Sequence, residues 1–324
     1  MPPSISVRAF AKINLGLKVL RLRADGYHEI RTVYQTIDLH DRLEIVLTRG
    51  SRISVECADP SVPSGRKNLV YGACQVWRRT SKFKGGIRVI LKKQIPAGSG
   101  LGGGSSDAAA CLLGLERLTG DCLDARARIQ LASDLGSDAP LFLLGGRVLG
   151  CGRGEEIYPL TDLSRRHCLV VYPGFKISTA DAYRQLDEVA CGSGARAPDS
   201  PPSPVASQAS AAPTGSKLTK RLGARKVKVF GVWSQFPVEH WGPAENDFEK
   251  VVFAKWPELE QLKIQFIRAG AETASLTGSG SAIYAIIDSA RQLSRALRIV
   301  PPGWLAFRAQ TLSREQYRRQ LFSP

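Results

Sequence analysis

The sequence lacks the residue clusters that build metal centres and disulfide frameworks. Its seven cysteines include no closely spaced pair, and its four histidines are scattered along the chain. We therefore expect neither a zinc site nor a disulfide scaffold, and the odd, dispersed thiols favour a reducing cytoplasm. No run of 18 apolar residues is present, which argues against a membrane span. The first 14 residues also lack the apolar segment of a signal peptide.

Acidic residues are scarce relative to basic ones. The chain has 29 Asp and Glu against 45 Lys and Arg, a formal charge of +16 that favours contact with phosphates, nucleic acids or acidic membranes. Four separate windows hold more than this excess: 8–31, 78–93, 217–228 and 291–324. A nucleic-acid footprint would gather its charge on one face, so the dispersed windows indicate mainly solvated surface.

The 324 residues are 43% hydrophobic, enough for one large or two ordinary globular domains. Apolar spacing predicts strands at 4–19, at 33–47 with a break at His40 and Asp41, at 86–91, at 168–172, twice within 272–287 and at 304–312. It predicts helices at 68–79 capped by Asn68, at 107–119 capped by Ser105 or Ser106, at 126–135, at 246–256 capped by Asn246, and at 290–297. Residues 192–216, rich in Pro, Ser, Ala and Gly, cannot bury a core and are expected to form a mobile surface insertion.

A glycine-rich loop follows the strand expected at 86–91. Gly98, Gly100 and Gly103 match a dinucleotide-binding pattern, but the second strand ending in an acidic residue that such a fold needs is missing. A Walker A loop is also excluded, because no lysine follows the glycines. Free backbone N–H groups, serine hydroxyls and a helix N-terminus nevertheless make an anion site, most naturally for nucleotide phosphates.

Residues 96–110 (PAGSGLGGGSSDAAA) resemble the nucleotide loop of the GHMP kinase superfamily, small-molecule kinases whose ATP loop lacks the Walker lysine. Four further segments resemble, in the same order, the other signatures of one branch that serves the non-mevalonate isoprenoid pathway: 11–17 (AKINLGL), 25–29 (DGYHE), 136–140 (GSDAP) and 276–281 (LTGSGS). The resemblance implies an α+β fold. It implies an N-terminal domain at 1–163 like domain 2 of ribosomal protein S5 and a ferredoxin-like C-terminal domain at 164–324.

The same resemblance implies an activity, cofactors and partners. The expected reaction is ATP-dependent phosphorylation of the 2-hydroxyl of a cytidine diphosphate-linked methylerythritol, with Mg²⁺ bridging the phosphates of ATP. No nucleic-acid or membrane partner is expected, and neither the oligomeric state nor the Mg²⁺ ligands are indicated. The alternatives are a GHMP kinase acting on homoserine, mevalonate or a sugar, a basic nucleic-acid-binding protein, and a scaffold that has lost activity.

Two residues are expected to carry the chemistry. Asp138 lies between Gly136 and Pro140, and from the sequence alone it would be a turn or helix-cap residue. The resemblance implies instead that it is the base that accepts the proton of the substrate hydroxyl. Lys12 lies in an apolar strand, and from the sequence alone it would be a surface lysine whose aliphatic stem packs on the strand. The resemblance implies that it lies beside Asp138, where its positive charge would keep the carboxylate ionised. Asn14 lies on the same strand face and is expected to hold either group.

The resemblance assigns the remaining site residues. Tyr27 is expected to stack on the cytosine, and His28 to read its edge by hydrogen bonds. Lys93 matches a lysine near the substrate phosphates, and Thr179 and Tyr183 match a substrate-lining helix. The expected ATP loop consists of Pro96, Ala97, Gly98, Ser99, Gly100, Leu101, Gly102, Gly103, Gly104, Ser105 and Ser106. Gly278, Ser279 and Gly280 are expected to support it from below, and a plain tight turn would also account for them.

Overall fold

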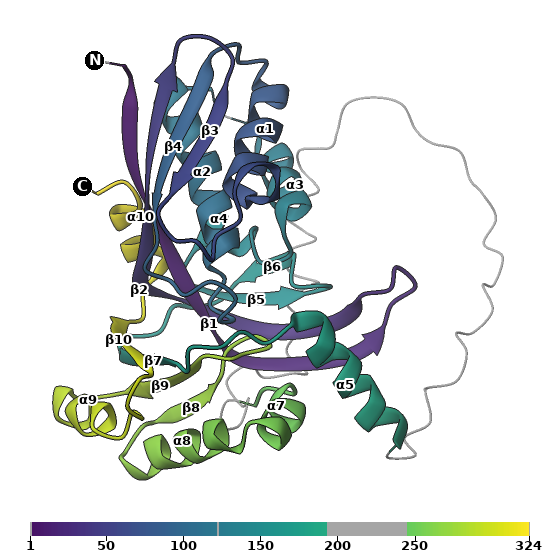
Figure 1. The fold of residues 1–324 in the computed structure, drawn as a ribbon, viewed down its shortest axis with the longest axis vertical. Helices are drawn as coiled ribbons and strands as arrows, with labels where there is room; N and C mark the ends of the chain where they lie inside the picture. Colours follow the sequence, from purple (N-terminus) through teal and green to yellow (C-terminus); the bar gives the residue numbers. More distant parts are fainter. Residues whose placement is uncertain (1, 122, 193–244, 324) are drawn as a thin grey trace. The chain divides into compact units, whose positions relative to one another are not determined.

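The computed structural model describes residues 2–121, 123–192 and 245–323 (Figure 1). Residues 1–186 and 244–324 form one compact unit, which contains every described strand. The second unit, 187–243, is represented among the described residues by the end of one helix. The expected insertion beyond residue 192 and the basic window at 217–228 lie outside the described residues.

The first half of the chain forms a six-stranded sheet. Its central path runs β3-β4-β2-β5-β6, and β1 pairs with β2; all pairs are antiparallel except β3 with β4. The strands are β1 (Ser4–Leu22), β2 (His28–Thr48), β3 (Ile53–Cys57), β4 (Gly86–Lys92), β5 (Arg147–Cys151) and β6 (Glu156–Pro159).

The break expected at His40 and Asp41 is wrong. β2 runs through both residues, and His40 pairs with Phe10 across the β1–β2 ladder, where an irregularity in register follows. Asp41 is fully buried and its Oδ1 accepts hydrogen bonds from the backbone N–H groups of Gln94 and Ile95. The polar pair that looked like a turn is therefore a bulged strand segment whose carboxylate fastens the chain entering the glycine loop.

Helices pack against this sheet around one apolar core (Figure 1). Trp77 and Leu112, from two of the helices, are buried there with Val7, Ile45 and Val89 of the strands. The helices of this half are α1 (Leu69–Ser81), α2 (Gly103–Thr119), α3 (Ala125–Leu135) and the short α4 (Leu141–Leu144). Asn68 caps α1 as expected, by accepting from the N–H of Val70 at 2.8 Å.

The expected caps of α2 are wrong. The helix begins at Gly103 after Gly102, whose φ is +72°, and no side chain caps it. Ser105 and Ser106 therefore lie inside the first turn rather than before it. The first N–H groups of the helix lack a side-chain cap, which leaves them available to an anion.

The second half forms a four-stranded antiparallel sheet in the order β10-β7-β9-β8. Its elements are β7 (His167–Tyr172), α5 (Thr179–Gly192), α7 (Glu249–Lys255), α8 (Pro257–Arg268), β8 (Thr273–Leu276), β9 (Ile283–Ile287), α9 (Ala290–Leu297) and β10 (Leu305–Gln310). The side chains of α7, α8 and α9 share an apolar core with the strands. The expected α+β fold with a ferredoxin-like second half is confirmed.

Three helix expectations in this half need correction. The helix expected at 246–256 starts only at Glu249: Asn246 Oδ1 accepts from the N–H of Phe248 in the turn before the helix, and the amide nitrogen of Asn246 donates to backbone carbonyls elsewhere. Directly after it, α8 begins with Pro257, which lacks the N–H that the first turn of a helix does not need; this helix was not expected. The C-terminal α10 (Arg314–Leu321) was also missed. It begins with a capping box of Ser313 and Gln316 and returns to the first core.

Candidate active site

The glycine loop borders a pocket of 190 Å³. Gly98, Gly100 and Gly102 all have positive φ, between +72° and +84°, which only glycine adopts without strain. The pocket is lined by Val62, Pro63, Lys67, Asn68, Leu69, Leu91, Lys93, Pro96, Ala97, Gly98, Ser99, Gly102, Gly103, Gly104 and Asp107. The loop therefore presents backbone to a cavity that also contains two lysines.

The segment 277–282 packs directly beneath this loop. A Cβ added to Gly100 would lie 2.0 Å from the carbonyl oxygen of Thr277, a distance that no side chain can occupy. The hydroxyl of Thr277 donates to the carbonyl of Gly100 at 3.2 Å, and the N–H of Ala282 donates to the carbonyl of Ser99 at 3.1 Å. The structure thus brings the Gly278, Ser279 and Gly280 turn against the glycine loop.

Lys12 and Asp138 form the ion pair of the site. The Lys12 Nζ lies 3.4 Å from Asp138 Oδ2; the lysine side chain is 3% exposed and the aspartate side chain 29%. The backbone N–H of Lys12 donates to the carbonyl of Leu101 at 3.0 Å, which fixes the pair beside the glycine loop. A buried cation next to a partly open carboxylate suits a base that reaches a substrate hydroxyl.

Asn14 holds the lysine from the same strand face, as expected. Its Oδ1 accepts from Lys12 Nζ at 2.7 Å, and it also accepts from the backbone N–H of Gly278 at 2.8 Å. Its amide nitrogen donates to the hydroxyl of Thr32 at 2.7 Å. Because lysine only donates, these partners fix the orientation of the amide.

Tyr34 was not singled out from the sequence. It lies on β2, is 1% exposed, and its hydroxyl donates to Asp138 Oδ1 at 2.9 Å. The Lys12 Nζ lies 5.5 Å from the centroid of its ring. Burial, followed by the charge of Asp138, raises the pKa of Tyr34 well above its ordinary value, so the phenol remains a donor. Tyr34 sits among apolar residues of a strand, a pattern that reads as core and gave no signal of this role.

Lys93 lies between two buried carboxylates. Its Nζ contacts Asp107 Oδ2 at 2.7 Å and also bonds Asp41, and all three side chains are at most 6% exposed. Burial opposes the charge of Lys93, but Asp107 and Asp41 raise its pKa above the ordinary value. Burial raises the pKa of Asp107 well above the usual range. Lys93 thus lines the pocket beside the glycine loop while it is held by protein carboxylates.

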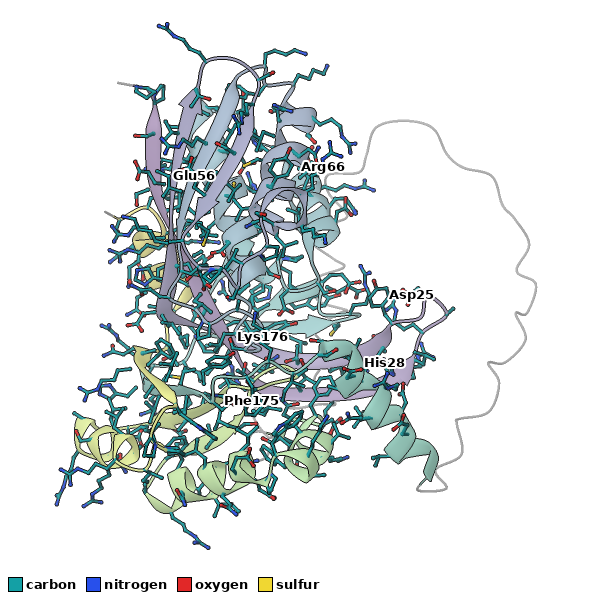
Figure 2. The ribbon with its side chains drawn as sticks, viewed as in Figure 1. Asp25, His28, Glu56, Arg66, Phe175 and Lys176 are labelled. Atoms are coloured by element: carbon teal, nitrogen blue, oxygen red, sulfur yellow. The ribbon has the colours of Figure 1, made fainter. Side chains whose placement is uncertain are left out.

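Aromatic residues gather where base recognition was expected. The ring of His28 stacks on Tyr183 of α5, with centroids 4.6 Å apart and planes 12° apart, and Figure 2 labels His28 beside this helix. Tyr27 is 53% exposed, and the Arg153 guanidinium lies 4.8 Å from its ring centroid. Burial raises the pKa of Tyr183 to about 12. These rings form an aromatic cluster in which His28 covers one face of Tyr183 and Arg153 covers one face of Tyr27, an environment suited to a flat heterocycle.

Two residues join α5 and its approach to the phosphate side of the site. The hydroxyls of Thr179 and Ser279 lie 2.9 Å apart, so Thr179 contacts the supporting turn. Lys176, labelled in Figure 2, has its side chain over the glycine loop: a Cβ at Gly98 would lie 2.9 Å from its Cδ. Lys176 is an exposed cation that the sequence analysis missed, because no motif contains it.

Among the described residues, no group of three or more histidine, cysteine or acidic side chains is arranged to hold a metal ion. The same residues include no helix long and apolar enough to cross a membrane.

Comparisons with known proteins identify the family of the chain. Family models match twice: "GHMP kinases N terminal domain" at residues 68–146 and "GHMP kinases C terminal" at 239–303. The 4-diphosphocytidyl-2-C-methyl-D-erythritol kinase of Solibacter usitatus is 39% identical over 96% of this chain and 90% of its own length. The kinase of the same name from Thermodesulfovibrio yellowstonii is 34% identical over 93% of this chain and 95% of its own.

Solved structures agree as well. A crystal structure of 4-(cytidine 5'-diphospho)-2C-methyl-D-erythritol kinase superposes with a TM-score of 0.70 and 30% identity, covering 95% of this chain and 99% of that one. The glycine loop, the turn beneath it and the pair of Lys12 with Asp138 thus lie in a chain whose relatives are kinases. The chain belongs to the 4-diphosphocytidyl-2-C-methyl-D-erythritol kinase family of the GHMP kinases.

Proposed function

We propose that this protein transfers the γ-phosphoryl group of ATP to the 2-hydroxyl of 4-diphosphocytidyl-2-C-methyl-D-erythritol, in the non-mevalonate route to isoprenoid precursors. The observation that carries the proposal is the Lys12–Asp138 pair, tied by backbone hydrogen bonding to the glycine loop. It places a carboxylate and a cation next to the expected phosphate site. The family of the relatives supplies the identity of the alcohol.

In the proposed mechanism, Asp138 orients the hydroxyl and accepts its proton as the oxygen attacks the γ-phosphorus. The bond from that phosphorus to the β,γ-bridging oxygen breaks, and ADP leaves. Phosphoryl transfer passes through a loose transition state, so the carboxylate takes the proton late and need not deprotonate a free alcohol. Lys12 stabilises negative charge on the alcohol oxygen and on Asp138.

The ATP phosphates are proposed to lie on the loop from Pro96 to Ser106. Its positive-φ glycines and the uncapped start of α2 offer N–H groups, and the helix dipole favours an anion there. The turn formed by Gly278, Ser279 and Gly280 supports the loop from beneath. The exposed Lys176, whose side chain lies over Gly98, adds positive charge that would favour the approach of a polyphosphate, whereas the charge of Lys93 is offset by Asp41 and Asp107.

Mg²⁺ fits this donor set, because it prefers to keep waters and to bind through one or two protein oxygens plus substrate phosphates. Ser106 Oγ is buried in the first turn of α2 and has no hydrogen-bond partner among the described residues. Ser105 lies in the same turn and is less buried. These hydroxyls would hold the ion, whose charge would offset that of the transferring phosphoryl group.

Substrate recognition is proposed to use the aromatic cluster. His28 would read the edge of the cytosine, while Tyr27 and Tyr183 would contact its faces. Thr179 would line the same side, and Asn14 would hold Lys12 in place. We assign the loop and the catalytic pair to a domain at 1–163 and the α5 contacts to a domain at 164–324. We place the reaction in the cytoplasm, where ATP is supplied.

A coupled ADP-release assay tests the proposal. The purified chain is given ATP and, in turn, the cytidine diphosphate-linked alcohol, homoserine, mevalonate and a hexose. We expect turnover only with the cytidine diphosphate-linked alcohol. We also expect CDP to inhibit this turnover by competing with that alcohol. Turnover with another alcohol, without inhibition by CDP, would assign a different GHMP kinase activity.

A further inference from the structure

The two oxygens of the Asp138 carboxylate lie in different surroundings. Oδ2 faces the Lys12 ammonium at 3.4 Å, and Oδ1 accepts a hydrogen bond from the Tyr34 hydroxyl at 2.9 Å. A carboxylate held at both oxygens cannot rotate about its terminal bond without losing one contact. The orientation of the base therefore depends on two side chains, one from β1 and one from β2.

The backbone around Tyr34 leaves room for its hydroxyl. A Cβ at Gly154 would lie 2.5 Å from that oxygen, and one at Gly150 would lie 2.5 Å from its ring Cε2. The absence of a side chain at these two glycines therefore leaves the space that the Tyr34 phenol occupies, and a side chain at either position would displace it. The ring packs in an apolar cluster with Leu141, Phe142 and Val148, for which a phenylalanine would serve equally well. The hydroxyl itself must have a partner, because burying an unpaired phenol is unfavourable.

We propose that Tyr34 is a positioning residue for the base: it orients the Asp138 carboxylate and, by hydrogen bonding to its charged form, keeps it ready to accept the substrate proton. The proposal rests on the proposed role of Asp138. A hydrogen bond to a carboxylate favours the ionised state, and one donated to Oδ1 leaves Oδ2 as the oxygen directed toward Lys12 and the hydroxyl.

The other ionisable groups around this carboxylate are Lys12 on β1 and Tyr183 on α5, and Glu155 acts on Tyr34. Lys12 supplies the only positive charge among these. Without the phenol, the carboxylate would be held by that cation alone and would turn toward it. A base paired closely with an ammonium is less available to a substrate hydroxyl, so the chemical step would slow while ATP binding stayed intact.

Tyr34→Phe is the direct test, because it removes one oxygen and keeps the ring. We expect kcat to fall by about tenfold, the KM for ATP to change less than twofold, and the acid limb of the kcat/KM profile to move to higher pH. Tyr158→Phe, the same deletion at an exposed phenol, is the control and should leave kcat and the acid limb unchanged. Wild-type kcat and an unmoved acid limb in Tyr34→Phe would overturn the proposal.

Gly154→Ala provides an independent route to the same contact. The added methyl would displace the Tyr34 hydroxyl, and so this variant should lower kcat in the wild-type background. In the Tyr34→Phe background the displaced atom is absent, and the same substitution should cost at most twofold more. The strain of alanine at φ +108° is common to both backgrounds and cancels in the comparison. Equal losses in the two backgrounds would contradict a role for the hydroxyl.

One further measurement needs no substrate. The carboxyl-carbon NMR signal of Asp138 in the full chain should shift on Tyr34→Phe and stay in place on Tyr158→Phe. An unchanged signal on Tyr34→Phe would overturn the inference. If the wild-type chain phosphorylates a different alcohol, the proposed substrate is wrong, and the kinetic test of Tyr34 runs on that alcohol instead.

Discussion

Asn14 Oδ1 accepts a hydrogen bond from the backbone N–H of Gly278 at 2.8 Å, across 264 positions of sequence. The same oxygen accepts from Lys12 Nζ at 2.7 Å and from the hydroxyl of Thr277 at 3.2 Å. One amide therefore joins Lys12, the proposed catalytic lysine, to the turn beneath the proposed ATP loop. The two proposed parts of the site share a single buried acceptor, so displacement of either part would disturb the other.

Replacing Asn14 by alanine should damage both parts. The N–H of Gly278 would lose its acceptor, while Lys12 and Thr277 would each lose one of two partners, and we expect a loss of about 2–3 kcal/mol in the free energy of unfolding. Misplacement of Lys12 should also lower kcat by about 10- to 100-fold. Urea unfolding and steady-state kinetics on the same preparation check this. A variant that loses stability but keeps wild-type kcat would reduce Asn14 to a structural role.

Asp138→Asn should remove transfer while preserving nucleotide binding. The amide has nearly the shape of the carboxylate but accepts no proton, and we expect kcat to fall by about a thousandfold or more. The affinity for a non-hydrolysable ATP analogue, measured by calorimetry, should stay within about threefold of wild type, because Asp138 does not line the nucleotide pocket. Asp134→Asn, at an exposed position on α3, is the matched control and should keep full activity. Substantial turnover by Asp138→Asn would assign the base elsewhere.

Gly100→Ala should push the glycine loop away from the turn at Thr277 that packs beneath it. The methyl would meet the carbonyl of Thr277 at 2.0 Å, so either the loop or the turn must move. We expect the KM for ATP to rise by about tenfold or more and thermal stability to fall. Gly120→Ala isolates the effect of the clash: its φ of +76° imposes similar strain, and nothing lies within 4 Å of the added atom. Equal behaviour of the two variants would mean that backbone strain, and not the contact with Thr277, explains the loss.

The buried charges around Lys93 predict a large stability effect. Lys93→Met would leave Asp41 and Asp107 facing each other without a cation, and breaking a buried pair costs about 3–5 kcal/mol. Arg88→Met removes an exposed partner of Glu56 from β4, the strand that ends just before Lys93, and such pairs are worth about 1 kcal/mol or less. Urea denaturation compares the two. Adding Asp107→Asn to Lys93→Met should recover part of the loss, because one of the uncompensated carboxylates is gone.

Sequence reasoning identified the elements whose signals are local. The spacing of Asn68 and Trp77 predicted α1, and the glycines predicted a loop before α2. Sequence reasoning failed at residues whose role is determined by contacts with distant parts of the chain. Asp41 resembles a turn residue in the sequence, but it is a buried acceptor for the N–H groups of Gln94 and Ile95. Asn246 accepts from the N–H of Phe248 before the helix, but no local pattern indicates that its amide nitrogen also donates to the carbonyls of Leu276 and Gly278.

The site divides in the same way. The sequence pointed to Lys12, Asn14 and Asp138, and the structure brings the three together. Tyr34 and Lys176 went unnoticed, because an aromatic on a strand and a lone lysine on a loop have no pattern of their own. Tyr34 contacts Asp138 and Lys176 contacts Gly98, each more than 75 positions away in the sequence. Local sequence patterns do not reveal such distant contacts.

Tyr183 makes a prediction in alkaline solution. Burial, then the charge of Asp138, raises its pKa from 10 to about 12, because the folded protein disfavours the phenolate. The neutral phenol thus contributes stability that is fully present below pH 10 and is lost as the pH rises through 12, by about 3 kcal/mol in all. The absorbance of the wild-type protein at 295 nm, minus that of Tyr183→Phe, should titrate with a midpoint near 12. Between pH 10 and 12, Tyr183→Phe should lose less stability than the wild-type protein, since the phenylalanine does not ionise in the unfolded chain. A difference titration centred at 10 would mean that the ring stacked on His28 is open to water, and the proposed cytosine contact would then have to form on an exposed phenol.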